Sequence, residues 1–195
     1  VAHPKIPVTS VRELIAYAKT RPGELNFCSA GNGSGSHLAG ELFNTMTGVK
    51  LTHIPYKGSG PAITELIGGH VQLMFAGIVP IDPHVKAGRV RGIAVSSAKR
   101  SLAIPQVPTI AESGLPGFDT YEWYGVFAPG KLPKDVLAKL SQEIARIVKL
   151  PDMSEKLSVQ GAIPVGNTPA EFSAFVKREM DTWGKVAQQV GLKPD

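Results

Sequence analysis

The stretch LNFCSAGNGSGSHLAGELFNTMT, residues 25–47, sets the architecture that we expect for this chain. Its start is an apolar run of the length of a buried strand, and Leu38, Leu42 and Met46 recur four apart, as on one face of a helix. Between the two lies AGNGSGS, residues 30–36, whose glycines allow the backbone to turn sharply. The sequence therefore predicts a strand at 25–29, a glycine-rich loop, and a helix at 37–47.

The order of strand, loop and helix repeats along the N-terminal half. Ser10 and Glu13 have the spacing of a capping box at a helix start. Pro61 stands near the start of another helical segment, where proline is favoured. Strands that alternate with helices predict an α/β fold, with a parallel sheet covered by helices on both faces. The other expected elements here are helices at 10–20, 61–67 and 82–87, and strands at 51–56, 71–75 and 90–96.

A change of character follows at residues 99–117, which carry three prolines and little periodicity. Such a segment is typical of a connection between lobes. We therefore expect two parts, residues 1–118 and 119–195. In the second part, Trp123, Tyr124 and Phe127 predict a packed strand face, with Trp183 as a partner. The elements expected there are strands at 121–128 and 163–165, and helices at 133–149, 154–159 and 168–190.

Composition excludes several classes of protein. With 43% hydrophobic and 19% charged residues in a chain of 195, the signature of a disordered chain is absent. A single cysteine, Cys28, excludes an internal disulfide framework. The formal charge of +5 is spread along the chain, so no nucleic-acid partner is expected, and the uncharged stretch 66–81 is too short and too broken to span a membrane. The histidines lack the spacing of a metal site, so neither a metal nor a cofactor is predicted.

The glycine-rich loop predicts an anion site. The helix after it should aim unpaired N–H groups and its positive dipole end at the loop, and four polar side chains could add contacts. Nucleotide motifs fit poorly, because no lysine follows the glycines and Ser36 stands where a dinucleotide fingerprint needs glycine. A hydrolase elbow needs serine where Gly33 stands. A turn whose glycines only satisfy backbone geometry is the alternative. The four polar side chains are those of Ser29, Asn32, Ser34 and Ser36.

Three further side chains have two interpretations each. His37, at the start of the expected helix, could donate to an anion or be merely solvated. Tyr56 and Lys57 precede a second loop, where they could form another wall of the pocket, or Lys57 could be an ordinary surface lysine. Ser34 or Ser36 as nucleophile with His37 as base would make a serine-dependent hydrolase or transferase. Neighbours on one loop are poorly placed for that chemistry.

Several separated motifs in order make the chain similar to a known family. CSAGNGSGSHLAGELF at 28–43, HIPYKGSGPAITELIGGHVQLMF at 53–75 and TPAEFSAFVKREMDTWGKV at 168–186 resemble the Bug proteins, the TctC-type extracytoplasmic receptors of tripartite tricarboxylate transporters. The resemblance covers essentially the whole chain. It implies a type II periplasmic binding-protein fold, a periplasmic location, a small organic carboxylate as ligand, membrane permease subunits as partners, and no enzymatic activity.

The resemblance also implies which residues contact the ligand. In the family, one strand-loop-helix element from each lobe holds a carboxylate, and the second-lobe element corresponds to residues 29–37. Many relatives have Phe-Asp-Asn where this chain has Phe75, Ala76 and Gly77, and the missing aspartate argues against an amino acid as ligand. The implied ligand-binding residues are Ser29, Ala30, Gly31, Asn32, Gly33, Ser34, His37, Tyr56, Lys57 and Ala76.

The family's first-lobe loop has no counterpart here. The chain begins at Val1 without methionine or leader, so we expect either a removed targeting peptide or missing upstream sequence. By analogy, residues 1–118 would be mostly the second lobe, and 119–195 would be C-terminal elements returning to the first. The strand at 121–128 would then lack a neighbour and expose an edge. A receptor-derived sensory module is a further alternative to transport.

Overall fold

The stretch at residues 25–47 folds as a strand, a loop and a helix in the computed structural model, which describes residues 1–159, 161–189 and 191. Strand β1 (Asn26–Ser29) lies at the centre of a parallel sheet of order β2-β1-β3. Its neighbours are β2 (Thr52–Pro55) and β3 (Leu73–Met74), with Phe27 opposite His53 and Leu73. The predicted α/β fold with a parallel sheet is confirmed.

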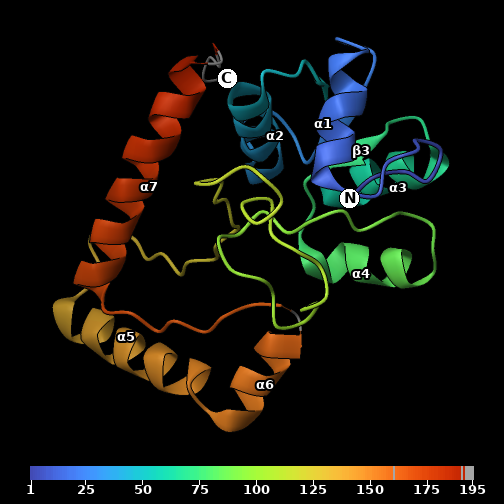
Figure 1. Cartoon of the computed structure of the whole chain (residues 1–195). Helices are drawn as coiled ribbons and strands as arrows, with labels where there is room; N and C mark the ends of the chain where they lie inside the picture. Colours follow the sequence, from blue (N-terminus) through green and yellow to red (C-terminus); the bar gives the residue numbers. More distant parts are fainter. Residues whose placement is uncertain (160, 190, 192–195) are drawn as a thin grey trace. The chain divides into compact units, whose positions relative to one another are not determined.

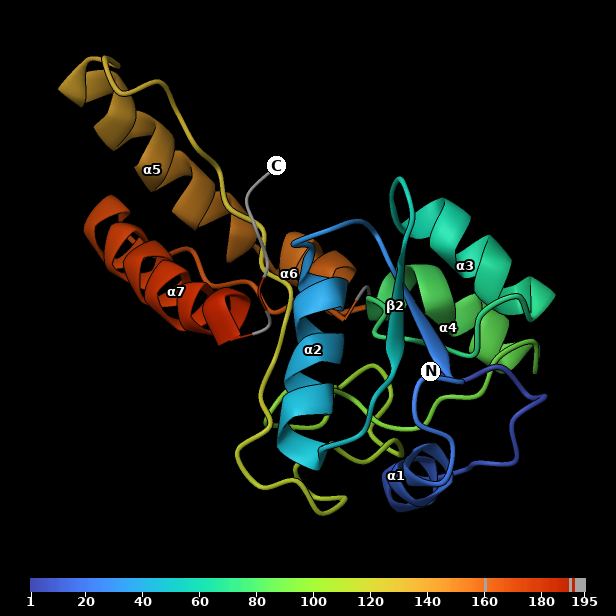
Figure 2. The same cartoon turned by 90° about the horizontal axis from the view of Figure 1, so that it is seen from above.

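Neighbouring residues of β1 face opposite sides of the sheet. Phe27 packs in a buried cluster with α1 (Val11–Lys19) and α2 (Gly35–Thr47), whereas Cys28 packs in another with α3 (Ser59–Gly68) and α4 (Ile78–Lys86). Figures 1 and 2 let the reader follow these helices, and Figure 2 shows α2 and α3 on opposite sides of β2. Because both faces of the sheet are covered, Phe27 and Cys28 are both fully buried.

Side-chain caps set where two of the helices begin. Ser10 caps α1 by accepting from the Glu13 N–H, although the Glu13 carboxylate accepts from Thr9 rather than from Ser10 itself. Ser34 caps α2 by accepting from the His37 N–H, so this helix begins two residues earlier than predicted. Gly48, with φ of 68°, ends α2 in the left-handed conformation that favours glycine.

Other helix starts were also predicted too late. Helix α3 begins at Ser59, which puts Pro61 at its third position, and α4 begins at Ile78. Helix α6 (Pro151–Val159) begins three residues before its expected start. The first turns of α3 and α6 contain glycine, proline or serine, so the apolar period that marks a helix appears only after them. In α4, Pro80 interrupts the apolar residues of the first turn.

The strand predicted at 90–96 is wrong. Residues 1–3 lie between this segment and β3, because Ala2 forms antiparallel bridges with both Leu73 and Arg91. The Ala2 N–H donates to Arg91 O at 2.8 Å, and the Arg91 N–H returns a bond to Ala2 O at 2.7 Å. The N-terminal segment thus takes the place that a further parallel strand would have had, and only isolated bridges remain around residues 91 and 95.

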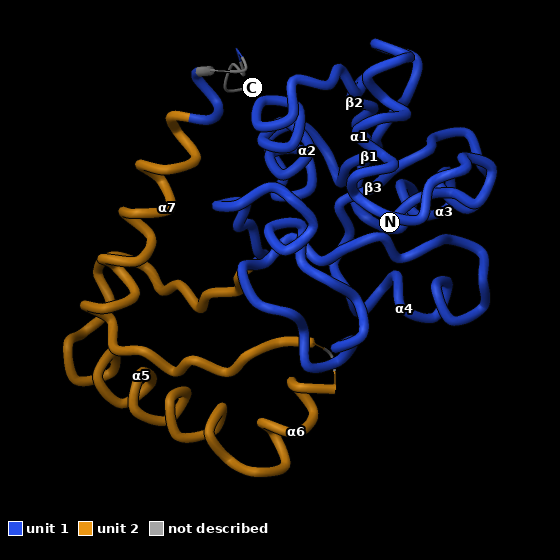
Figure 3. The backbone as a smooth tube through the Cα atoms, viewed as in Figure 1, with its two compact units in different colours: residues 1–122, 186–195 blue, residues 123–185 orange. Residues whose placement is uncertain are grey.

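The proline-bearing segment at 99–117 does not act as a connection between compact parts. Its Ile110 and Leu115 lie in the core with Phe118, and Val95 forms a parallel bridge with Thr109. The chain divides later, into a first unit of Val1–Glu122 with a C-terminal stretch from Val186, and a second unit of Trp123–Lys185 (Figure 3).

The second unit consists of helices and extended segments. It holds α5 (Lys134–Val148), α6 and most of α7 (Pro169–Gln189), while position 190 of the last predicted helix lies outside the described residues. Among the described residues, the segments at 121–128 and 163–165 form no ladder with another strand. The strands predicted there are therefore wrong. No helix in the described ranges is long and apolar enough to cross a bilayer.

Aromatic rings of the second unit contact one another. Trp123 contacts the rings of Phe172 and Phe175 edge-on, with centroids 5.8 Å and 5.3 Å apart, and Phe127 joins them. Tyr124 points away and is 90% exposed. The predicted packed face is therefore wrong for Tyr124 and Phe127, which are mostly exposed, and Trp123 contacts the first turns of α7. The indole N–H of Trp183, the predicted partner, donates to Glu179.

Candidate functional site

The glycine-rich loop lies at the carboxyl edge of the sheet, beside the loop that follows β2. The Tyr56 N–H donates to Ser29 O at 3.1 Å, and the Gly58 N–H donates to Ala30 O at 2.9 Å. Gly31 has φ of 140°, and a Cβ there would stand 3.3 Å from Tyr56 O. The two loops approach so closely that glycine is needed at position 31.

Five N–H groups of the loop and first helical turn are already used within the protein. Ser29 Oγ accepts from Gly31 at 3.1 Å, Gly31 O accepts from Ser34 at 3.2 Å, and His37 Nδ1 accepts from Gly33 at 3.0 Å. The remaining two are Ala30, which donates to Ser36 Oγ, and His37, which donates to Ser34 Oγ. The expectation that the whole loop presents free N–H groups is therefore wrong.

Three N–H groups remain without a partner among the described residues: those of Asn32, Gly35 and Ser36. The last two belong to the first turn of α2, which contains no acidic side chain. Unpaired N–H groups at a helix start carry the positive end of the helix dipole, and this end stabilises an anion by about 0.3–1 kcal/mol, up to ~2 when partly buried. The geometry suits one carboxylate group.

The serine hydroxyls hold the loop together. Ser34 Oγ donates to Gly31 O at 2.7 Å and lies 3.0 Å from Ser36 Oγ. Ser29 is fully buried, with Oγ 2.6 Å from His53 Nε2. Asn32 is the exposed polar side chain of the four. Ser29 and Ser36 therefore hold the loop backbone in place, because their hydroxyl groups accept from the Gly31 and Ala30 N–H groups.

His37 lies beneath the loop, stacked on His53. The two ring centroids are 3.6 Å apart and the planes differ by 8°. Burial lowers the pKa of His37; burial and then the neighbouring His37 lower the pKa of His53 to about 4. Because His37 Nδ1 accepts from a backbone N–H, its proton is on Nε2, which lies 3.8 Å from Glu41 Oε1. The sequence indicated His37 as a candidate residue, but not its stacking on His53, which lies on strand β2.

The remaining sequence-predicted residues lie at the same edge with different orientations. The Tyr56 hydroxyl donates to Glu65 at 3.3 Å, so the phenol faces α3 rather than the glycine-rich loop. Lys57 is exposed and has no hydrogen-bond or ion-pair partner in the described part of the chain. Ala76 is half-buried beside the cluster of α3 and α4. The loops that follow β1, β2 and β3 thus lie at one edge of the sheet. The Tyr56 side chain points away from this edge, toward α3.

Glu122 is a site residue that sequence reasoning missed. Its side chain lies 3.6 Å from where a Cβ on Gly35 would be and 3.2 Å from where a Cβ on Gly77 would be. Gly35 opens α2 and Gly77 caps α4, so one exposed carboxylate stands beside two helix starts. No local pattern could have indicated this, because Glu122 is almost ninety residues from Gly35 along the chain.

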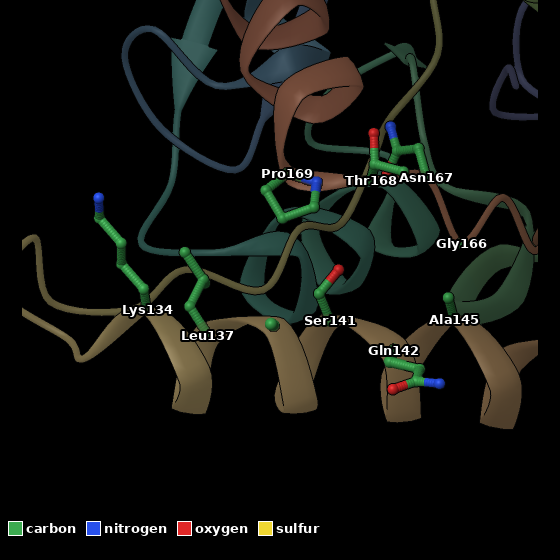
Figure 4. Close-up of a pocket in the computed structure, with 10 residues that line it drawn as sticks. Lys134, Leu137, Ser141, Gln142, Ala145, Gly166, Asn167, Thr168 and Pro169 are labelled. Atoms are coloured by element: carbon green, nitrogen blue, oxygen red, sulfur yellow. The ribbon is translucent and has the colours of Figure 1, made fainter.

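Two grooves of the structure lie away from the glycine-rich loop. One groove of about 440 Å³ in the second unit lies between α5 and the start of α7, where Ser141 points toward Pro169 (Figure 4). Another of similar size lies between α3 and α4, lined by residues that include Ile63 and Arg89. Neither groove is lined by a residue of 29–37.

Nucleophilic catalysis is not supported by the ring nitrogens of His37. Nδ1 is occupied by the Gly33 N–H, and Nε2 faces Glu41. Ser29 and His53 are within hydrogen-bond distance, but Ser29 has no exposed surface through which a substrate could reach it. The loop can bind and orient a group, and it lacks the arrangement of an activated serine.

The chain is similar to known proteins along nearly its whole length. The model of the family "Tripartite tricarboxylate transporter family receptor" matches residues 1–192. Protein BugT of Bordetella pertussis is 37% identical over 193 residues, covering 99% of this chain and 59% of its own length. The R. palustris protein Rpa4515, solved with adipate, superposes with a TM-score of 0.94 at 39% identity, over all of this chain and 65% of that one.

A third similar protein, BugD, is named as a periplasmic binding protein. The periplasmic binding protein BugD superposes with a TM-score of 0.87 at 32% identity, covering 100% of this chain and 66% of that one. The present chain therefore has the α/β fold of a periplasmic binding protein, and it spans about two thirds of the BugD chain and 59% of BugT. These relatives are named as receptors or binding proteins.

Proposed function

Because the chain belongs to the tripartite tricarboxylate transporter family of receptors, we propose that it is the ligand-holding part of a receptor for a small organic carboxylate. The observation that carries the proposal is the start of α2, where the Gly35 and Ser36 N–H groups have no partner among the described residues and the first turn has no acid. A carboxylate placed there would accept two hydrogen bonds and face the positive end of the helix.

The first expected feature of the ligand is a carboxylate group at one end. Asn32 adds a third unpaired N–H and an exposed amide side chain at the tip of the loop. Rpa4515, which is similar to this chain, was solved with adipate. The roles of Ala30, Gly31, Gly33 and Ser34 are to shape this wall, and Lys57 is free to approach an anion from the second loop.

The division into lobes follows from the same proposal. Residues 1–118 would be the second lobe of a two-lobed receptor, and 119–195 would return to the first lobe. Two features of the second unit support this: the segments at 121–128 and 163–165 have no strand partner in the described chain, and apolar side chains such as Val126, Phe127 and Ile163 are two thirds or more exposed. Apolar residues in extended segments are typical of strands that complete a sheet.

Transport would follow from closure of the two lobes on the ligand. A second wall from the other lobe would enclose a carboxylate bound at the glycine-rich loop. The closed form would be recognised by membrane permease subunits, and the receptor would work in the periplasm. These partners and this location rest on membership of the family.

Calorimetric titration of the full-length protein tests the proposal. The panel would contain adipate, malate, a monocarboxylate, glutamate, and adipamide as the uncharged match to adipate. We expect at least one carboxylate to bind, adipamide to fail, and glutamate to be weak because Ala76 leaves no carboxylate in the third loop. A folded protein that binds none of the carboxylates, or binds adipamide equally well, would contradict the proposal.

A further inference from the structure

The stacked histidines beneath the glycine-rich loop connect three elements. His37 comes from the first turn of α2 and His53 from β2, and Phe27 of β1 lies next to both rings, with centroids 6.4 Å and 5.0 Å away. His37 is only 4% exposed. The stacked pair therefore lies directly beneath the glycine-rich loop and contacts it through Gly33 and Ser29.

Each ring holds one point of the loop. His37 Nδ1 accepts the Gly33 N–H at 3.0 Å, and His53 Nε2 lies 2.6 Å from Ser29 Oγ, which in turn accepts the Gly31 N–H. Gly33 has φ of 71°, and no atom lies within 4 Å of where its Cβ would be. The hydrogen bond to His37 is its side-chain anchor.

Only a neutral His37 can make this bond. Protonation would place a hydrogen on Nδ1, opposite the hydrogen of the Gly33 N–H, so that two donors would face each other. It would also set a cation 3.6 Å from the centre of the second ring. Phe27 from β1 and Ser29 from the same strand carry no charge that could compensate.

Glu41 is the charged group that faces the pair in the described chain. It lies on α2, one turn beyond His37, with Oε1 3.8 Å from His37 Nε2, and burial raises its own pKa. Glu41 approaches the nitrogen that already carries a proton, so it cannot restore the lost bond at Nδ1. Burial lowers the pKa of both histidines, consistent with a pair held neutral.

We propose that His37 and His53, in their neutral forms, are positioning residues of the ligand loop, and that ligand affinity falls on acidification because protonated His37 cannot hold Gly33. The inference rests on the proposed carboxylate function of the same loop. It adds that His37 does not act as a counter-ion: a proton on its ring weakens binding although it brings positive charge nearer to the anion.

The decisive variant is His37→Asn. The asparagine carbonyl can stand near the position of Nδ1 and accept the Gly33 N–H, but it does not titrate. Adipate affinity would be measured by calorimetry in the full-length protein between pH 7.5 and 5.0, with the exposed His70→Asn as the matched control. Titration of the ligand is common to all proteins, so the difference between the pH profiles reports the imidazole.

We expect wild type and His70→Asn to lose affinity in parallel, by up to about tenfold per pH unit below the pKa of the ring, and His37→Asn to lose less. Equal profiles for all three proteins, or tighter binding of wild type at low pH relative to His37→Asn, would overturn the inference. If no carboxylate binds at pH 7.5, the proposed function itself fails. That result differs from the expected pH profiles and from those that would overturn the inference.

A second measurement does not depend on the variant being folded. In wild-type protein without ligand, the backbone amide resonance of Gly33 should shift with the titration of His37 and broaden as the loop is released. The Gly58 amide, which donates to Ala30 O rather than to a histidine, is the internal reference. A Gly33 resonance that stays constant while the His37 ring titrates would contradict the proposed anchor.

Discussion

The ring of Phe27 packs against Gly40 so closely that no side chain fits between β1 and α2. A Cβ at Gly40 would lie 2.7 Å from Phe27 Cδ2, and Phe27 has no exposed surface into which it could move. We therefore expect Gly40→Ala to destabilise the protein by about 1–3 kcal/mol, because overpacking outweighs the gain of up to about 1 kcal/mol in helix propensity. Urea unfolding measures the change.

Gly60→Ala is the control for this substitution. Gly60 is also helical, in α3, and no atom lies within 4 Å of its Cβ position. It should leave stability unchanged or raise it slightly. Equal losses in the two variants would mean that the Phe27 contact is not the cause.

Gly33→Ala should weaken carboxylate binding. At φ of 71° an alanine costs roughly 1–2 kcal/mol, and the loop would relax away from its binding geometry. Gly88 is a close match outside the loop, with φ of 69° and an equally open Cβ position. Both alanine variants should lose similar stability by thermal unfolding, but only the one at position 33 should lose affinity for adipate.

Ser34→Ala should reduce both stability and affinity. The substitution removes the cap of α2 and the 2.7 Å bond to Gly31 O, at a cost of about 0.5–2 kcal/mol. Ser10→Ala removes the corresponding cap of α1, far from the loop in sequence, and should affect stability alone. Unchanged adipate binding by Ser34→Ala would argue against a ligand at the start of α2.

Protein stability should fall as pH decreases from about 6.5 to about 4. The folded-state pKa of His53 is about 4, below the usual value of about 6.5 in an unfolded chain, because burial disfavours the charged ring. Between these values the unfolded chain binds a proton that the folded one does not, so acid favours unfolding. Urea titrations at several pH values should show a shallower fall for His53→Gln. Parallel curves would assign the pH dependence to other groups.

Glu122→Gln should tighten carboxylate binding. The wild-type carboxylate lies beside Gly35 at the start of α2, where it repels a second anion. The gain should be about twofold to fivefold at low salt and smaller at high salt, as expected for one exposed charge. Glu24→Gln, before the amino end of β1, removes the same charge away from the loop and should change little. Weaker binding by Glu122→Gln would show that Glu122 assists the ligand instead.

Local patterns predicted the elements whose cause lies within a few residues. The apolar run before the glycine-rich loop became β1, and the period of Leu38, Leu42 and Met46 marked α2. Helix starts were less accurate, because caps and first turns carry polar or small residues without that period. The sequence also predicts an anion site at the glycine-rich loop, because this loop joins a strand to the start of a helix.

Predictions that depended on distant partners were the ones that failed. The segment at 90–96 has the composition of a strand, yet Ala2 occupies the position beside β3 that would have completed its ladder. The segment at 121–128 is also rich in strand-forming residues but has no neighbour among the described residues. Strand pairing is a property of two segments, and sequence alone reports only one at a time.

The amino-acid sequence by itself determined the alternation of strands and helices, the glycine-rich turn at the end of β1 and the family to which the chain belongs. Tertiary structure decided which N–H groups of that turn stay unpaired, that His37 stacks on His53, and that Glu122 stands beside Gly35. The physical reason is the distance along the chain over which each interaction acts. Helix hydrogen bonds and caps join residues three or four apart, whereas contacts between distant residues depend on how the whole core packs.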